Sequence, residues 1–169
     1  SNKKIELAFL QRFTGVDIRI SSNREIDLDK FHSDLFSMLS KYIYADSSTD
    51  LENIIGDLLK EKKLTLSTAE SCTGGLIADR LTNIPGSSAF FQGGIIAYSN
   101  DVKISDLGVS EKILNKKGAV SSDVAKDMAK GIRQKYNTNI GLSTTGRAGP
   151  EGGSIDTPVG LFYIGLSTE

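Results

Sequence analysis

Three side chains that can act as nucleophiles follow one another in this chain: Ser71, Cys72 and Thr73, with Gly74 and Gly75 directly behind them. A short run of apolar and β-branched residues precedes them, and apolar residues at helical spacing follow. This pattern predicts a junction between a strand and a helix. The backbone N–H groups at a helix start lack partners, and the helix dipole favours negative charge there. A nucleophile or an anion-binding loop can use such a corner.

A serine nucleophile needs a base, and the chain contains a single histidine, His32. His32 falls at the edge of the apolar stripe of a predicted helix, so we interpret it as structural. Lys103, just past the end of a predicted strand, is the candidate base, provided that burial lowers its pKa. The alternative is an exposed helix lysine, because lysine is mostly exposed. Tyr98 is a second polar candidate beside it.

Cys72 competes with Ser71 for the role of nucleophile. A thiol at a helix start can have a lowered pKa, but a free cysteine is equally typical of a small buried residue. Thr73 can hold a phosphate together with the N–H groups of the two glycines, or can simply cap the helix. Glu70 can orient the site, or can be an ordinary carboxylate at a helix start. The residues alone leave these alternatives open.

A glycine-rich loop follows another predicted strand at residues 139–145. Ligand sites in α/β sheets gather beyond the carboxyl ends of strands, so we expect the turns near residues 71, 100 and 147 to form one pocket. Arg147 can clamp a phosphate there or point to solvent. No dinucleotide-binding fingerprint and no phosphate-binding P-loop is present. The candidate binding residues of this loop are Thr145, Gly146, Arg147, Ala148 and Gly149.

The composition narrows the classes of function. The 169 residues carry a formal net charge of -1, which gives no general attraction to nucleic acids or anionic membranes. One cysteine excludes an internal disulfide and a multi-cysteine metal site. No apolar run is long enough to span a membrane, and no signal peptide is evident. We therefore expect a cytoplasmic protein without a metal or other cofactor.

The chain is predicted to form two parts. Residues 1–46 combine two alternating strands with an amphipathic helix, which indicates a small α+β unit with little core of its own. A polar linker at 45–50 follows. Residues 47–169 alternate helices and strands, which favours an α/β fold with helices layered on a sheet.

Six short motifs occur in the order in which the CinA family (competence/damage-inducible proteins) has them, and the similarity covers about residues 51–166. The chain resembles the C-terminal domain of that family, and residues 7–44, with GVDIRI at 15–20, look like its small KH-like domain. The motifs are TAESCTGG at 68–75, GGIIAYSN at 93–100, LGV at 107–109, GAVS at 118–121, TGRAGP at 145–150 and PVG at 158–160.

The resemblance implies a nicotinamide-nucleotide amidohydrolase, which converts nicotinamide mononucleotide and water to nicotinate mononucleotide and ammonia. It implies Ser71 as the nucleophile, Lys103 as its base and Tyr98 as a neighbouring polar group. Backbone N–H groups around Thr73 and Gly74, or in the loop at 145–149, would stabilise the oxyanion. It also implies a homo-oligomer that acts on a small nucleotide.

The chain departs from the family pattern in three ways. Arg147 stands where the family usually has an apolar residue. The family continues beyond Glu169 with a further strand and a long helix, and it carries a larger N-terminal domain. The first two of these departures motivate an alternative, a nucleotide- or partner-binding module without turnover. Nucleic-acid binding is not expected, because the Gly-x-x-Gly loop of true KH domains is missing from residues 18–35.

Overall fold

The computed structural model describes residues 5–12, 15–22, 28–47 and 49–168. The chain divides into two compact units, Ser1–Ile54 and Ile55–Glu169. The division falls within helix α2 (Leu51–Lys62), later in the chain than the linker at 45–50.

The first unit is a two-stranded sheet with one helix. Strands β1 (Ile5–Arg12) and β2 (Gly15–Ser22) pair antiparallel along their whole length, and α1 (Leu28–Leu39) packs on β2. No residue of α1 is buried, and several large apolar side chains of the unit are exposed. His32 bonds the carboxylate of Asp46 at 2.6 Å. The expected order of two strands and a helix with little core is confirmed.

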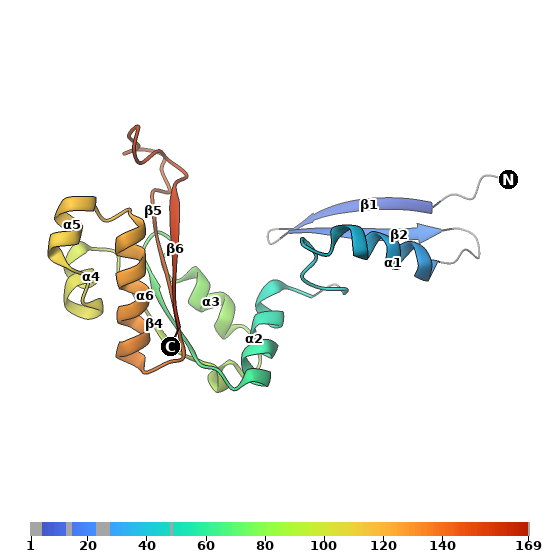
Figure 1. The fold of residues 1–169 in the computed structure, drawn as a ribbon, viewed down its shortest axis with the longest axis horizontal. Helices are drawn as coiled ribbons and strands as arrows, with labels where there is room; N and C mark the ends of the chain where they lie inside the picture. The colour runs from blue at the N-terminus through green and yellow to red at the C-terminus, as the bar shows by residue number, and fades with distance from the viewer. Residues whose placement is uncertain (1–4, 13–14, 23–27, 48, 169) are drawn as a thin grey trace. The chain divides into compact units, whose positions relative to one another are not determined.

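The second unit is built on a four-stranded sheet in the order β4-β3-β5-β6 (Figure 1). The central strand β3 (Leu66–Glu70) is buried at every position and pairs parallel with both β4 (Phe91–Ile96) and β5 (Ile140–Gly146). Strand β6 (Phe162–Ser167) closes one edge antiparallel to β5. Burial on both faces is typical of a strand at the centre of a parallel sheet. The predicted α/β fold is confirmed.

Helices cover both faces of this sheet. The long helix α6 (Ser122–Tyr136) packs across β3, β5 and β6, and α4 (Asn100–Leu107) and α5 (Glu111–Lys117) pack on α6 (Figure 1). On the other face, α3 (Leu76–Thr82) packs on β3 and β4, and a 3-10 helix (Ser87–Ala89) contacts α3 and β4. The C-terminal half of α2 contributes Leu59 to the core on that face.

Local sequence explains where α6 begins and how closely α4 approaches it. The side chain of Ser121 accepts the N–H of Val124, one of the two caps expected at this helix start. Gly131 lies directly against the backbone of Leu107, so closely that a Cβ atom at Gly131 would lie 1.9 Å from the Leu107 carbonyl oxygen. Only glycine permits this approach, which brings the end of α4 close to α6.

Within the described part of the chain, no helix has the length and apolar character needed to cross a membrane. Across the same residues, no group of three or more His, Cys, Asp or Glu side chains is arranged to hold a metal ion.

Candidate active site

The carboxyl ends of β3, β4 and β5 meet at one edge of the sheet. The N–H of Ser71 donates to the carbonyl of Thr144 at 3.0 Å, which continues the parallel ladder between β3 and β5 by one residue. On the other side, the N–H of Ala97 donates to the carbonyl of Glu70 at 2.7 Å. Ser71 therefore lies between the ends of β4 and β5, where the sequence predicts a pocket.

Lys103 contacts Ser71 directly. Its Nζ atom lies 3.2 Å from Ser71 Oγ, although 32 positions separate the two residues. The same Nζ donates to the backbone carbonyls of Ala97 at 2.7 Å and Tyr98 at 3.1 Å. Three oxygens thus hold the amine in one orientation, pointing at the serine hydroxyl.

Burial makes Lys103 an unusual lysine. Only 1% of its surface is exposed, and desolvation lowers its pKa from the ordinary value of 10.5, against a smaller opposing effect of the Cys72 thiol. A lysine with a lowered pKa loses its proton more readily and can then accept one from a hydroxyl. The structure therefore gives Ser71 a nitrogen base within hydrogen-bonding distance that is a lysine and not a histidine.

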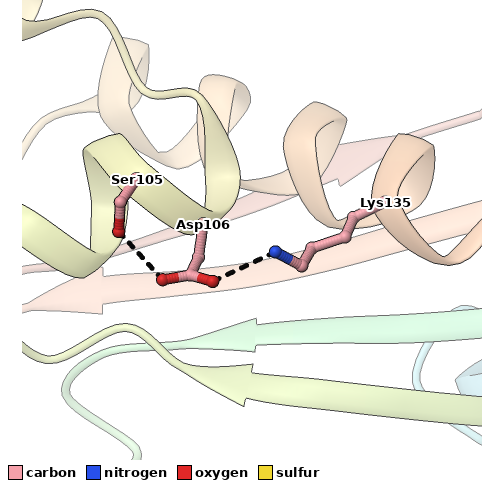
Figure 2. A network of polar contacts seen from close by, with 3 residues as sticks. All are labelled: Ser105, Asp106 and Lys135. Atoms are coloured by element: carbon pink, nitrogen blue, oxygen red, sulfur yellow. Dashed lines mark hydrogen bonds and ion pairs between the residues drawn. The ribbon is translucent and has the colours of Figure 1, made fainter.

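Helix α4 carries Lys103 and is fixed at its start and near its end. At its start, the Ser99 side chain accepts the N–H of Val102 at 3.2 Å. Near its end, the Asp106 carboxylate accepts hydrogen bonds from Ser105 at 2.9 Å and from Lys135 of α6 at 3.0 Å (Figure 2). The Asp106–Lys135 ion pair joins the helix that carries the base to the helix that packs on the sheet.

We expect the replacement Lys135→Met to have only a small effect on stability, because both partners of this ion pair are partly exposed to solvent. The hydrogen bond from Lys135 lowers the pKa of Asp106, so the pair stabilises the fold above the ordinary carboxylate pKa and ceases to do so as pH falls through the lowered value. Melting temperatures of the two proteins should differ slightly at neutral pH and low salt and converge at acid pH or high salt. A difference that persists at acid pH would contradict this assignment.

The Glu70 carboxylate occupies the start of α3. It is 1% exposed and accepts three backbone N–H groups, those of Gly75 at 3.1 Å, Ile77 at 3.0 Å and Ala78 at 2.8 Å. This corrects the expected anion site at the helix start, because the protein's own carboxylate fills it. Glu70 holds the turn after β3 rather than facing a ligand, which is the helix-start alternative considered above.

The two glycines of this turn have backbone roles. Gly74 and Gly75 have φ angles of 61° and 100°, a region that favours glycine. The N–H of Gly74 donates to the Ser71 carbonyl at 3.2 Å, and that of Gly75 donates to Glu70. Both expected anion donors are thus engaged within the turn.

Cys72 and Thr73 face a residue that the sequence did not single out, Thr144. The Thr73 and Thr144 hydroxyls lie 2.7 Å apart, and Thr144 also bonds the Cys72 thiol. Burial raises the pKa of Cys72. This rise is only partly offset by hydrogen bonds from the backbone of Cys72 and Thr73 and from the Thr144 side chain, and by the positive charge of Lys103. The lowered thiol pKa considered from sequence is therefore wrong, since desolvation outweighs the helix start.

Two other candidate residues, Tyr98 and Thr145, make contacts that differ from those expected of side chains in the site. The Tyr98 side chain is 78% exposed, and its contact with Lys103 runs through the backbone carbonyl. Thr145 is buried, and its hydroxyl donates to the Ala119 carbonyl at 2.8 Å, on the α6 side of the sheet. Successive strand residues point to opposite faces, so Thr144 and Thr145 cannot both face the turn after β3.

The loop after β5 packs mainly on itself and on the start of β6. A Cβ atom at Gly146 would lie 2.2 Å from the Phe162 ring, and one at Gly149 would lie 2.5 Å from Val159. Ala148 and Gly149 are exposed. Arg147 is anchored through its backbone, with its N–H donating to Leu161 at 2.9 Å and its carbonyl accepting from Gly160 at 2.8 Å.

Comparison with known proteins agrees with the motifs that surround this site. Residues 48–169 match the family model of the CinA C-terminal domain. The chain belongs to the CinA family. A CinA-like protein of Dictyoglomus turgidum is 57% identical over 128 residues, which cover 76% of this chain and 31% of that protein. A CinA-like protein of Chloroherpeton thalassium is 49% identical over 168 residues, which cover 96% of this chain and 40% of that protein.

A solved CinA-family structure shares the fold. The competence/damage inducible protein CihA of Agrobacterium tumefaciens aligns with a TM-score of 0.68 and 44% identity, over 70% of this chain and 72% of that one. The chain spans between 31% and 41% of the length of the curated CinA relatives it matches. The match to the CinA family model begins at residue 48, so it leaves out most of the first unit, Ser1–Ile54.

Proposed function

We propose that this CinA-family chain is a nicotinamide-nucleotide amidohydrolase, which converts nicotinamide mononucleotide and water to nicotinate mononucleotide and ammonia. The contact between Lys103 Nζ and Ser71 Oγ, with the lysine buried and its pKa lowered, is the observation that carries the proposal. A serine with an adjacent deprotonated base is the arrangement needed for attack on an amide carbonyl.

In the proposed reaction, neutral Lys103 takes the proton of Ser71 Oγ as that oxygen attacks the amide carbon. The protonated lysine then gives its proton to the departing nitrogen, which leaves as ammonia, and an ester links Ser71 to the nicotinoyl group. A water molecule attacks this ester while Lys103 accepts the proton of the water. The carboxylate product departs, and the serine oxygen regains a proton.

The oxyanion formed in both attacks needs hydrogen-bond donors. The N–H groups of Gly74 and Gly75 donate to the oxygens of Ser71 and Glu70. Among the residues that the structure describes, the backbone N–H of Thr73 bonds only the Cys72 sulfur, a weak acceptor that an oxyanion can replace, so we assign this role to Thr73.

The proposal also includes the surroundings of the site. We propose that residues 1–46 form a KH-like unit and residues 47–169 the amidohydrolase domain, that the protein assembles as a homo-oligomer, and that it works in the cytoplasm. Tight binding of the mononucleotide without ammonia release would instead favour a binding module.

The test is ammonia release from nicotinamide mononucleotide, measured across pH. Lys103 must be neutral to act as a base, so kcat/KM should rise with pH as the lysine loses its proton. Because burial lowers its pKa, the midpoint should lie below the ordinary value of 10.5. Absence of ammonia would exclude the activity. A rate that does not depend on pH would exclude Lys103 as the base.

A further inference from the structure

Arg147 is a cation without a counter-ion in the part of the chain that the structure describes. Its Nε atom is shielded from solvent and makes no hydrogen bond, one of two such buried side-chain atoms among those residues. No carboxylate of the described residues forms an ion pair with it. A buried N–H without an acceptor costs free energy. We therefore expect a bound ligand to supply the acceptor for the Nε–H of Arg147.

The glycine-rich loop passes beside the guanidinium of Arg147. A Cβ atom at Gly152 would lie 3.0 Å from Arg147 Nη1, which shows that this loop passes close to the side chain. The backbone of Arg147 is tied to Leu161 and Gly160 by two hydrogen bonds. The backbone of Arg147 is therefore fixed, and its Nε is turned away from solvent.

Arg147 lies at the same edge of the sheet as Ser71 but away from the reacting amide. Thr144, whose carbonyl accepts the Ser71 N–H, precedes Arg147 by three residues, which places their backbones at most about 10 Å apart. Burial lowers the pKa of Lys103 and the nearby Cys72 raises it, whereas Arg147 has no effect on it. A guanidinium at this distance from Ser71 can bind a portion of the substrate that does not react.

We infer that Arg147 binds the phosphate of a phosphorylated substrate and makes the site selective for mononucleotides over nucleosides. This inference rests on the proposed function. Guanidinium groups bind phosphate through paired, charge-assisted hydrogen bonds, and the unused Nε–H is one of the donors needed. The ring and ribose of a pyridine mononucleotide separate its amide from its phosphate, as the sheet edge separates Ser71 from Arg147.

The first experiment compares nicotinamide mononucleotide with nicotinamide riboside as substrates. In the variant Arg147→Met, kcat/KM for the mononucleotide should fall about 10- to 100-fold, the usual effect of losing a hydrogen bond to a charged group. The value for the riboside should stay unchanged. Arg147→Lys keeps the charge and should retain part of the preference. Lys117→Met, which removes one positive charge at the exposed end of α5, should leave both values unchanged.

The second experiment does not depend on catalysis. Calorimetric titration with ribose 5-phosphate, with ribose as the control sugar, should show binding to the unmodified protein and to Ser71→Ala. Binding should be lost in Arg147→Met, whose folding is checked by circular dichroism. Equal binding to the unmodified protein and Arg147→Met, or no binding to either, would overturn the inference.

The two experiments separate the inference from the function on which it rests. If no ammonia is released but ribose 5-phosphate binds only when Arg147 is present, the amidohydrolase proposal fails and the phosphate site stands. If ammonia is released from mononucleotide and riboside with the same ratio in Arg147→Met as in the unmodified protein, the phosphate site fails and the amidohydrolase stands.

Discussion

Replacing Ser71 by alanine is expected to abolish ammonia release from nicotinamide mononucleotide, with a fall in kcat/KM of at least about 1,000-fold. The replacement removes the only atom that Lys103 Nζ contacts on the proposed reaction path, the oxygen 3.2 Å away. Lys103→Met should have an effect of about 100- to 10,000-fold, the usual contribution of a general base. The measurement is steady-state ammonia release, with substrate binding followed separately by calorimetry.

The double variant should be hardly worse than Ser71→Ala alone, because residues that act as a unit are not additive. The neighbouring change Cys72→Ala is the matched control, since burial raises the pKa of that thiol and leaves it a poor nucleophile. It should retain most of the activity. If Cys72→Ala removed the activity and Ser71→Ala did not, the assignment of the nucleophile would be reversed.

Glu70→Gln should be the most damaging conservative change in the second unit, costing about 2–4 kcal/mol of unfolding free energy, since hydrogen bonds to charged groups contribute about 1.5–3 kcal/mol each. The carboxylate accepts N–H groups on both oxygens, from Gly75 and Ile77 on one and Ala78 on the other. A glutamine keeps one oxygen and turns an NH2 group toward a backbone donor. Urea denaturation of both proteins measures the difference.

The control for this change is Glu111→Gln, in the first turn of α5, where the side chain is exposed. It removes the same charge from a helix start without leaving a buried donor unpaired, and we expect a change within about 0.5 kcal/mol. Similar stability losses in the two variants would mean that the three hydrogen bonds of Glu70 contribute little. Equal stability of Glu70→Gln and the unmodified protein would mean the same.

The periodic patterns in the sequence were enough to predict most elements of the second unit. The strand β5 and the helix α6 follow directly from apolar spacing, and the structure selects Ser121 from the two serines that the sequence offered as its cap. The meeting of three turns at one edge followed from the rule for α/β sheets. That rule needed only the strand order, which places β3 between β4 and β5.

The finer details of the site depended on contacts that no local pattern reveals. Thr144 was not predicted because one more threonine in a strand carries no chemical signal. Only the register that sets Glu70 opposite Thr144 brings its side chain to Thr73. Tyr98 was predicted as a polar group next to Lys103, and its contact with Lys103 runs through its backbone carbonyl. Residue type predicts side-chain chemistry. Because every residue has a backbone carbonyl, the sequence does not mark which carbonyl contacts the lysine.

The orientation of Lys103 has a consequence for how this site tolerates mutation over time. Two of the three atoms that hold its amine are main-chain oxygens, of Ala97 and Tyr98. A substitution of the exposed Tyr98 side chain leaves its carbonyl in place, whereas a larger side chain at fully buried Ala97 would overpack the core and displace the acceptor. Substitutions that can misalign the base therefore include those at Ser71, Lys103 and Ala97, at Gly131, where α4 packs on α6, and at Ser99, Asp106 and Lys135, which fix α4. Substitutions at exposed Tyr98 can therefore accumulate without disturbing Lys103.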